Sequence, residues 1–297
     1  MLRRLTAREL PLFAVLLVPG LAVVALVIVV PLVLVLQYST YQASSFSGGG
    51  TFVGLENYAT LLGSPDFWQS LWRTLVYAGG SVLAQLVVGI AVALVLNVKF
   101  RGSTFLRGAA IVPYIVPAVV ATIAWEWILD PSTGIFNKLL EALGLQAVNF
   151  LSAPWAMTTV IMLSTWAWAP FVIIVFLSGL QTIPQELYES ARVDGAGHVR
   201  QFFSITLPML RDLVITIVVL RGIWMFNKFD MIYLLTAGGP LDRTRTLPVL
   251  VYDEAFQQFH VGYGSAVAVV SLLVMLTGLL LFLWLSRDRS ENREVAR

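Results

Sequence analysis

The most regular feature of this chain is a series of long apolar segments separated by shorter polar stretches. A helix that crosses the hydrocarbon core of a membrane needs about 20 mostly apolar residues. Six segments meet this requirement: Leu10–Leu36, Thr74–Leu96, Phe105–Leu129, Ala156–Leu180, Leu207–Leu235 and Gly264–Leu285. The pattern therefore predicts an all-α, polytopic membrane protein with six transmembrane helices.

The first segment could also be a secretory signal, because Arg3, Arg4 and Arg8 precede it. The apolar region of a cleavable signal is only about 7–15 residues long. Leu10–Leu36 is much longer and contains no charge. A transmembrane helix is therefore the better interpretation of this segment.

Composition supports a membrane protein. Of the 297 residues, 58% are hydrophobic and only 12% are charged, whereas soluble domains have about 25% charged residues. A soluble domain could not hide this much apolar surface from water. The chain has no cysteine, which excludes disulfides and thiolate metal sites.

The distribution of Lys and Arg predicts the orientation, because cytoplasmic loops are enriched in these residues. Four of the 19 basic residues fall on one side (Arg73, Lys138, Arg243 and Arg245), and Arg221 and Lys228 fall inside the fifth segment. The other side has 13: Arg3, Arg4, Arg8, Lys99, Arg101, Arg107, Arg192, Arg200, Arg211, Arg287, Arg289, Arg293 and Arg297. We expect both termini and the polar stretch between the fourth and fifth segments to be cytoplasmic.

The loops on the outer side contain further structure. Ser44–Thr51 is expected to be a flexible turn, and Ile135–Leu143 and Pro248–Gln258 are expected to form short helices. Pro113 and Pro117 bracket Tyr114, and each proline tends to kink a helix. These prolines indicate a bend that lines a pore, although ordinary helix packing would also accommodate it.

Two cations inside the fifth segment are candidate functional residues. A charge near the centre of a bilayer costs at least about 2.5 kcal/mol, so it is expected to face the interior of the bundle. Arg221 and Lys228 are seven residues apart, which is two helical turns, so they are expected to share one helical face. Asp230 then points elsewhere, although either Asp230 or Glu126 could neutralise one cation. Alternatively, Lys228 extends toward the outer interface.

The fourth segment contains a second candidate feature, the sequence STWAWAPF from Ser164 to Phe171. Trp166 and Trp168 lie in the middle of the segment rather than at an interface. Sugar sites use aromatic rings for the apolar faces of the sugar and polar groups for its hydroxyls. The alternative is that these bulky side chains only pack between helices.

Motifs for catalysis and nucleotide binding are missing. The sequence has no phosphate-binding loop, so we expect this chain not to bind ATP itself. There are two histidines, His198 and His260; His198 has no second ligand at metal-binding spacing, and no metal site is expected. A polytopic membrane enzyme would need paired acids or a nucleophile with its base within the bundle, and the sequence shows no convincing pair of this kind. A secondary transporter would usually show internal repeats.

The polar stretch 181–208 is predicted to form two short helices. Thr182–Pro184 is typical of a helix start, and Gly195 after Asp194 suits a left-handed helix end. A second helix is expected over Gly197–Thr206, before Pro208 begins the fifth membrane segment. Two helices with a sharp corner would form a rigid projection, suited to the groove of a partner protein.

The residues of this stretch resemble a known family. Glu189-Ser190-Ala191, Asp194-Gly195-Ala196, Ile205 and Leu207-Pro208 are similar to the coupling loop of binding-protein-dependent ABC-transporter permeases. Further blocks, including IVPYIVPAVVATIAW from Ile111 and FNKFDMIYLLTAGGP from Phe226, resemble the carbohydrate-uptake permeases of the maltose/glycerol-3-phosphate type. The resemblance extends from about Phe52 to Leu285.

This resemblance implies a type I ABC importer permease fold in the plasma or inner membrane. It implies one transmembrane permease domain over 1–297, with a core at 70–285 and a cytoplasmic coupling loop at 181–208. The expected partners are a second, related permease in a heterodimer, two ATPase subunits that hold ATP and Mg²⁺, and an extracytoplasmic sugar-binding protein. No nucleic acid is expected, and no cofactor is expected on this chain.

The resemblance also implies roles for particular residues. The residues expected to contact the ATPase are Glu186, Glu189, Ser190, Ala191, Asp194, Gly195 and Ala196. The positions expected at the substrate, including polar neighbours in the fifth segment, are Tyr114, Ala118, Ser164, Ala167, Trp168, Phe171, Arg221, Met225, Asn227, Lys228 and Asp230.

Some of these positions depart from the family pattern. Ser164 stands where Asn is frequent, Trp168 stands where Gly is frequent, and Lys228 replaces a neutral amide. A sugar or oligosaccharide is the expected substrate. A glycerol phosphate ester or a polyol is the alternative, and Arg221 and Lys228 would be the charge partners of an ester.

Overall fold

The structure, a computed structural model, describes residues 10–46, 48–98 and 101–294. Arg3, Arg4, Arg8, Lys99 and Arg297, on which part of the predicted orientation depends, lie outside the described residues. The described part of the chain divides into two compact units. The first comprises Met1–Phe67, as far as it is described, with Leu250–Leu273, and the second comprises Trp68–Val249 with the described part of Val274–Arg297.

The first unit contains a long N-terminal helical segment and a small β-hairpin. Its elements are α1 (Leu10–Val24), the π-helical turn η1 (Ala25–Val29), α2 (Val30–Tyr38), β1 (Tyr41–Gln42), β2 (Thr51–Phe52), α3 (Glu56–Gly63) and η3 (Asp253–Gln257), with the first part of α15 (Val261–Glu294). The strands are antiparallel, with Tyr41 opposite Phe52. Gly48, Gly49 and Gly50 all have positive φ angles in the turn predicted at Ser44–Thr51.

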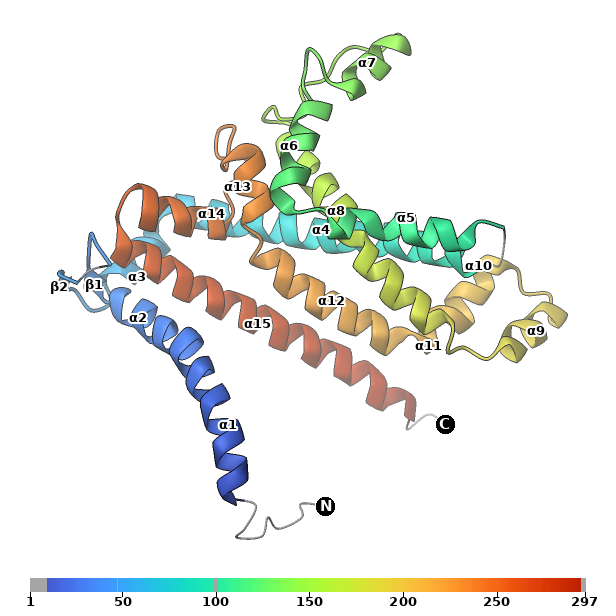
Figure 1. The fold of residues 1–297 in the computed structure, drawn as a ribbon, viewed down its shortest axis with the longest axis horizontal. Coiled ribbons are helices and arrows are strands. Elements are labelled where there is room, and N and C mark those ends of the chain that lie inside the picture. Colours follow the sequence, from blue (N-terminus) through green and yellow to red (C-terminus); the bar gives the residue numbers. More distant parts are fainter. Residues whose placement is uncertain (1–9, 47, 99–100, 295–297) are drawn as a thin grey trace. The chain divides into compact units, whose positions relative to one another are not determined.

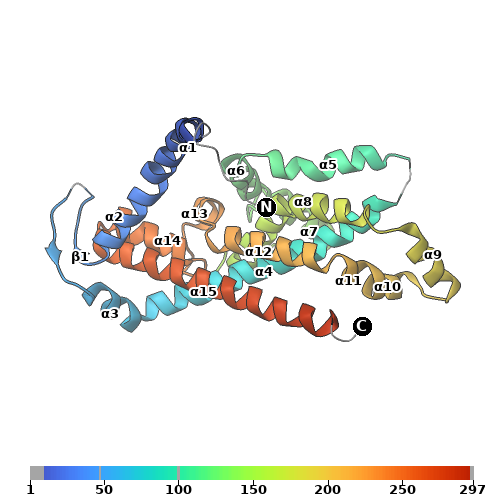
Figure 2. The same ribbon diagram turned by 90° about the horizontal axis from the view of Figure 1, so that it is seen from below.

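The second unit consists of helices and the turns that join them (Figures 1 and 2). Its elements are α4 (Pro65–Asn97), α5 (Ser103–Ile115), α6 (Ala118–Ile128), α7 (Ile135–Ala142), α8 (Ala156–Leu180), α9 (Gln185–Val193), α10 (His198–Gln201), η2 (Phe202–Thr206), α11 (Leu207–Met209), α12 (Arg211–Phe226), α13 (Asp230–Thr236) and α14 (Leu247–Tyr252); α4 begins and α14 ends in the first unit. The short helices predicted at Ile135–Leu143 and Pro248–Gln258 are therefore present, the second as α14 followed by η3.

Among the described residues, four helices are long and apolar enough to span a membrane: Leu17–Tyr38, Pro65–Asn97, Ala156–Leu180 and Val261–Ser286. Two further spans are possible as bent pairs, α5 with α6 at 99°, and His198–Met209 with α12 at 72°. The prediction of six membrane helices agrees with these spans. The third and fifth segments, however, are not continuous helices as the sequence pattern suggested.

Proline and the residue before it explain the break in the third segment. Val116 has an extended backbone, with ψ of 127°, and Pro117 has ψ of 138°. The residue before a proline is pushed out of the helical region by steric contact with the proline ring. The predicted bend therefore lies at Val116–Pro117, whereas Pro113 remains inside α5.

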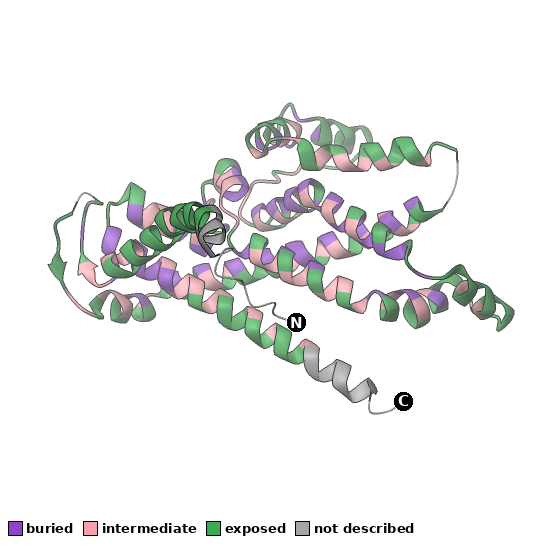
Figure 3. Ribbon diagram, turned by 60° about the horizontal axis from the view of Figure 1, so that its bottom comes forward, coloured by how far each residue is buried: buried purple, intermediate pink, exposed green. Residues whose placement is uncertain are grey.

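Burial differs strongly between the helices (Figure 3). Helix α8 is the most enclosed of the spans, with 56% of its most apolar window buried, against 0% for Leu17–Tyr38. One core cluster joins α8 to α4 and to the connection that follows it, through Ala93, Leu96, Ile173, Phe176, Leu180, Ile183 and Leu210. Leu83, Val87 and Val95 of α4 are exposed, as expected for side chains that face lipid.

The contact between α4 and α8 depends on a glycine. A Cβ atom added at Gly89 would lie 2.6 Å from Cβ of Val172, whereas one added at Gly79 in the same helix would meet nothing within 4 Å. Overpacking of this kind costs about 1–3 kcal/mol.

We therefore expect Gly89→Ala to lower the free energy of unfolding in mixed detergent micelles, and Gly79→Ala to leave it unchanged or to raise it slightly. Equal effects of the two substitutions would contradict this account of the α4–α8 contact.

Candidate functional site

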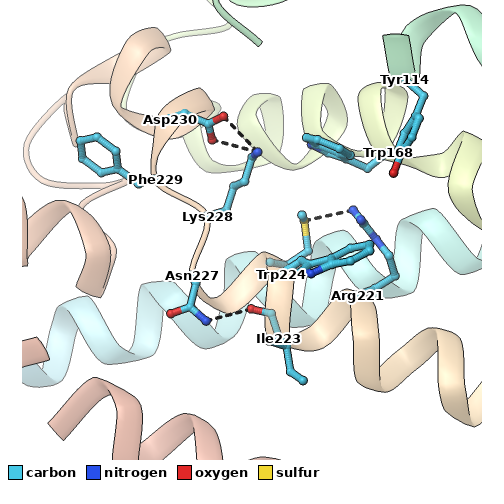
Figure 4. Close-up of a pocket in the computed structure, with 10 residues that line it drawn as sticks. Tyr114, Trp168, Arg221, Ile223, Trp224, Asn227, Lys228, Phe229 and Asp230 are labelled. Atoms are coloured by element: carbon cyan, nitrogen blue, oxygen red, sulfur yellow. Dashed lines mark hydrogen bonds and ion pairs between the residues drawn. The ribbon is translucent and has the colours of Figure 1, made fainter. Parts of the chain in front are cut away.

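The second unit contains a cavity of about 560 Å³ between the bend after α5, the middle of α8 and the end of α12. Figure 4 shows the side chains that line it, which come from segments far apart in the sequence. They are Tyr114, Trp168, Arg221, Ile223, Trp224, Met225, Asn227, Lys228, Phe229 and Asp230. The two broken segments and the most buried helix therefore supply one site.

Arg221 is the most buried charged residue at the cavity, with 1% of its surface exposed. Its Nε atom donates a hydrogen bond of 2.7 Å to Oε1 of Gln85, and its Nη2 atom makes a long contact of 3.8 Å with the sulfur of Met225. Its guanidinium carbon lies 5.3–5.7 Å from the ring centroids of Trp168, Phe171 and Trp224. The side chain is thus fixed by one amide and surrounded by aromatic rings.

Lys228 reaches the cavity by a different route from the one predicted. Helix α12 ends at Phe226 and α13 begins at Asp230, so the prediction that Arg221 and Lys228 share one helical face is wrong. Lys228 lies in the break, where its Nζ atom is 2.9 Å from Oδ1 of Asp230 and 4.3 Å from the ring centroid of Trp168. The interpretation in which Lys228 extends outward is therefore wrong, as is the expectation that Asp230 points elsewhere.

A buried polar network lies next to the cavity. The hydroxyls of Tyr77 and Ser164 are 2.7 Å apart, and both side chains are almost completely buried. Gln85 accepts the hydrogen bond of Arg221, and its own Nε2 atom contacts the sulfur of Met225 at 3.4 Å. Ser164 is 0% exposed and is not among the residues that line the cavity, so it supports the site from behind in this conformation.

The other predicted substrate positions are spread around the cavity. Phe171 packs edge-on against Trp224, with the ring centroids 5.3 Å apart. Asn227 lines the cavity and donates a hydrogen bond of 3.0 Å to the carbonyl of Ile223. Ala118 is the first residue of α6, and Ala167 is buried in α8; neither is among the lining residues. Trp166 packs against Trp125, away from Trp168.

Sequence reasoning missed three residues that define the site. Trp224 lines the cavity, Gln85 holds Arg221, and Tyr77 is bonded to Ser164 behind the cavity. Gln85 is the only amide within the predicted segment Thr74–Leu96, and a strong hydrogen-bonding group inside a membrane span needs a partner. This signal could have found Gln85, whereas no comparable signal marks Trp224 among the other tryptophans.

At one end of the second unit, α9 and the α10–η2 segment form a projection, here called the knob, of residues 185–206. The corner has the hydrogen bonds of a Schellman motif, from Gly195 to the carbonyl of Arg192 at 3.0 Å and from Ala196 to that of Ala191 at 2.8 Å. Gly195 has φ of +77°, in the left-handed region that favours glycine. The predicted two-helix arrangement and its corner at Gly195 are confirmed.

The knob is tied together and attached to the membrane helices. Nε2 of Gln201 donates to the carbonyl of Ala196 at 2.7 Å, and the hydroxyls of Tyr188 and Thr206 are 2.8 Å apart. Tyr188, Phe202 and Ile205 pack against the core cluster that contains Phe176 of α8. The outer surface is exposed and partly apolar, with Val193 88% and Val199 72% exposed.

Comparison with known proteins identifies the family. Residues 85–291 match the family described as binding-protein-dependent transport system inner membrane component, and this match includes α8, α12 and the knob. The chain belongs to this family. It is an ABC-transporter permease subunit with several apolar helices in the membrane, as the resemblance predicted.

The alignments with similar proteins extend over most of this permease. It is 34% identical to the trehalose/maltose transport system permease protein MalF of Thermococcus litoralis, over 97% of this chain and 98% of that protein. It is also 34% identical to the sulfoquinovosyl glycerol transport system permease protein SmoG of Agrobacterium fabrum, over 87% and 85%. A solved bacterial alginate ABC transporter, in complex with an alginate pentasaccharide-bound periplasmic protein, contains a chain with a TM-score of 0.83 at 25% identity, covering 95% of each chain.

The Tyr77–Ser164 pair allows a test of the network beside the cavity. We expect Tyr77→Phe and Ser164→Ala each to lower the free energy of unfolding by about 1–3 kcal/mol, because each leaves a buried hydroxyl without its close partner. The double variant should lose less than the sum of the two single losses. Additive losses, measured by detergent titration of the purified permease complex, would show that the two hydroxyls do not interact.

Proposed function

We propose that this permease translocates a sugar or oligosaccharide, which an extracytoplasmic binding protein delivers. The cavity combines aromatic faces from Tyr114 and Trp168 with polar groups from Asn227 and Lys228, which is the combination that sugar rings and hydroxyls require. The named substrates of the similar proteins, trehalose/maltose and alginate, support a carbohydrate. The lining of one cavity by residues beside the α5–α6 and α12–α13 breaks carries this proposal.

The energy for transport would come from separate chains. In this proposal, the permease pairs with a second, related permease, and two ATPase subunits that hold ATP and Mg²⁺ bind below the pair. The sequence has no phosphate-binding loop of its own. The knob offers the exposed side chains of Glu186, Glu189, Ser190 and Asp194 for docking into a cleft of an ATPase.

In this proposal, the knob lies on the cytoplasmic side of the membrane. Arg192 and Arg200 lie on the knob, and Arg211 follows it and donates to the carbonyl of Ser286 near the end of α15 at 2.7 Å. Arg107 binds the carbonyl of Leu96 at 2.8 Å, close to the same core cluster. This gathering of basic residues at one end of the second unit supports a cytoplasmic knob.

We propose that transport occurs by alternating access, in which the cavity opens to one side of the membrane at a time. The position of the knob in the chain, between two helices that reach the cavity, supports this proposal. Helix α8 runs from the cavity at Trp168 to Leu180, just before α9, and α12 runs back from Arg211 to the cavity at Arg221. We propose that closure of the ATPase pair moves the knob, and that these two helices carry the motion to the cavity.

Two substitutions at one position test the role of the knob. Gly195→Val places a β-branched residue at positive φ, which costs about 1–2 kcal/mol and distorts the corner. Gly195→Asn should be tolerated, because asparagine adopts the left-handed conformation more readily. In proteoliposomes of the full transporter, we expect the Val variant to lose most of the substrate-stimulated ATP hydrolysis and uptake of a radiolabelled sugar, and the Asn variant to keep most of both.

Both variants should insert into the membrane in normal amounts, as measured by their yield in purified membranes. Full uptake and full stimulated ATPase activity in the Val variant would contradict the proposed role of the knob. If the wild-type transporter takes up none of a panel of labelled mono- and oligosaccharides, the carbohydrate proposal fails, whatever the two variants do.

A further inference from the structure

We propose that the substrate of this cavity is an acidic saccharide, whose carboxylate, sulfonate or phosphate group binds the guanidinium of Arg221. This inference rests on the proposed function, because it takes the cavity as the site of a sugar and specifies the charge of that sugar. Two observations support it: the net positive charge at the cavity, and buried hydrogen-bond donors that have no partner.

The charges that line the cavity do not cancel. Lys228 and Asp230 form an ion pair of 2.9 Å, so together they contribute no net charge. Arg221 is the remaining charged residue of the lining. Within the part of the chain that the structure describes, no carboxylate forms an ion pair with Arg221. The cavity therefore has a net charge of about +1 from these side chains, since Arg is always protonated in proteins.

A buried cation without a counter-ion is unfavourable, because it loses its hydration without gaining an opposite charge. Gln85 satisfies one N–H group of Arg221, and the surrounding aromatic rings offset part of the lost hydration through cation–π attraction. Rings and amides cannot neutralise the charge. A substrate that brings an anionic group would complete the site.

Two buried donors show where such a group would bind. Among the described residues, Nη1 of Arg221 and Nε1 of Trp168 have no hydrogen-bond partner. Both residues line the cavity, and the Trp168 ring lies 5.4 Å from the guanidinium carbon. Buried polar atoms without partners are rare in folded proteins and call for a ligand or an ordered water. An oxyanion has several acceptor oxygens and could accept from both groups.

Lys228 is a weaker candidate for the same role, although it is closer to the Trp168 ring at 4.3 Å. Its Nζ atom is already in contact with both carboxylate oxygens of Asp230, at 2.9 and 3.1 Å. An anionic substrate at Lys228 would have to compete with an existing carboxylate, whereas at Arg221 it would not.

Two methyl glycosides that differ only in one acid group test the inference. We would measure the binding of methyl β-glucuronide and methyl β-glucoside to the purified, nucleotide-free transporter by calorimetry at neutral pH. A hydrogen bond to a charged group is strong enough for a preference of about tenfold or more for the glucuronide. Raising the salt concentration should reduce this preference.

Three variants identify the group responsible. Arg221→Met keeps an unbranched, apolar stem and removes the charge and the N–H donors, so the preference for the glucuronide should disappear. Gln85→Glu leaves Arg221 in place and gives it an internal carboxylate at the position of the present 2.7 Å hydrogen bond, so the preference should also disappear. Lys138→Gln, in the exposed helix α7 outside the cavity, removes the same charge and should keep the wild-type preference.

Equal binding of the two glycosides to the wild-type transporter would overturn the inference and leave the proposed carbohydrate function standing. A full preference in the Gln85→Glu variant would also overturn it. If neither glycoside binds to the wild-type transporter and no labelled sugar is taken up, the proposed function fails together with the inference. The wild-type comparison does not depend on whether the variants fold.

Discussion

A break in a membrane helix leaves backbone N–H and C=O groups without helical partners, and these groups cannot face hydrocarbon. This constraint determines where the cavity of the permease lies. The α5–α6 break lies at Val116–Pro117, and the α12–α13 break lies at Asn227–Phe229. Helix α8 packs against α5, α12 and α13, and α6 packs against α13. Neighbouring helices thus pack against the helices on both sides of each break, although Pro117 itself is exposed, and side chains beside the breaks line the cavity.

The same constraint explains the charged residues. A cation on a continuous, lipid-facing helix would be costly, whereas a cation beside a break can be surrounded by polar groups of neighbouring helices. Lys228, in the break, is paired in this way with Asp230 at the start of α13, and Arg221, inside α12, is bonded to Gln85 of α4. Polar groups from four helices therefore hold the cavity in shape, because Tyr77 of α4 and Ser164 of α8 complete the network.

Local sequence signals predicted the knob more accurately than the site. Each end of α9 depends on residues next to it in the sequence, Pro184 at the start and Gly195 at the end, and these residues act in the same way in any protein context. The apolar segments were predicted because length and composition are enough to identify a span. The break at Lys228 was missed because helical spacing assumes a continuous helix. The pairing of Lys228 with Asp230 follows from that break and could not be read from the spacing.

The cost of burying charge explains which site residues could be found from sequence alone. Arg221 stood out because a cation inside an apolar segment needs compensation wherever the segment lies. Trp224 looks like any other aromatic residue of a membrane helix until the fold places it 5.3 Å from the guanidinium. The residue types could therefore indicate that a polar site exists in the fifth segment, and the resemblance supplied its neighbours in α8. Gln85 of α4 and Trp224 of α12 were missed.

The knob and the cavity are connected through packed side chains as well as through the chain itself. Ile183, just before α9, and Leu210, just before α12, are both buried in the cluster that contains Phe176 of α8. Phe176 lies two helical turns from Trp168 at the cavity. Because close-packed side chains transmit displacement rather than absorb it, a force on the exposed corner at Gly195 would reach α8 and α12 together. The two helices that carry Trp168 and Arg221 are then the ones that the knob is best placed to move.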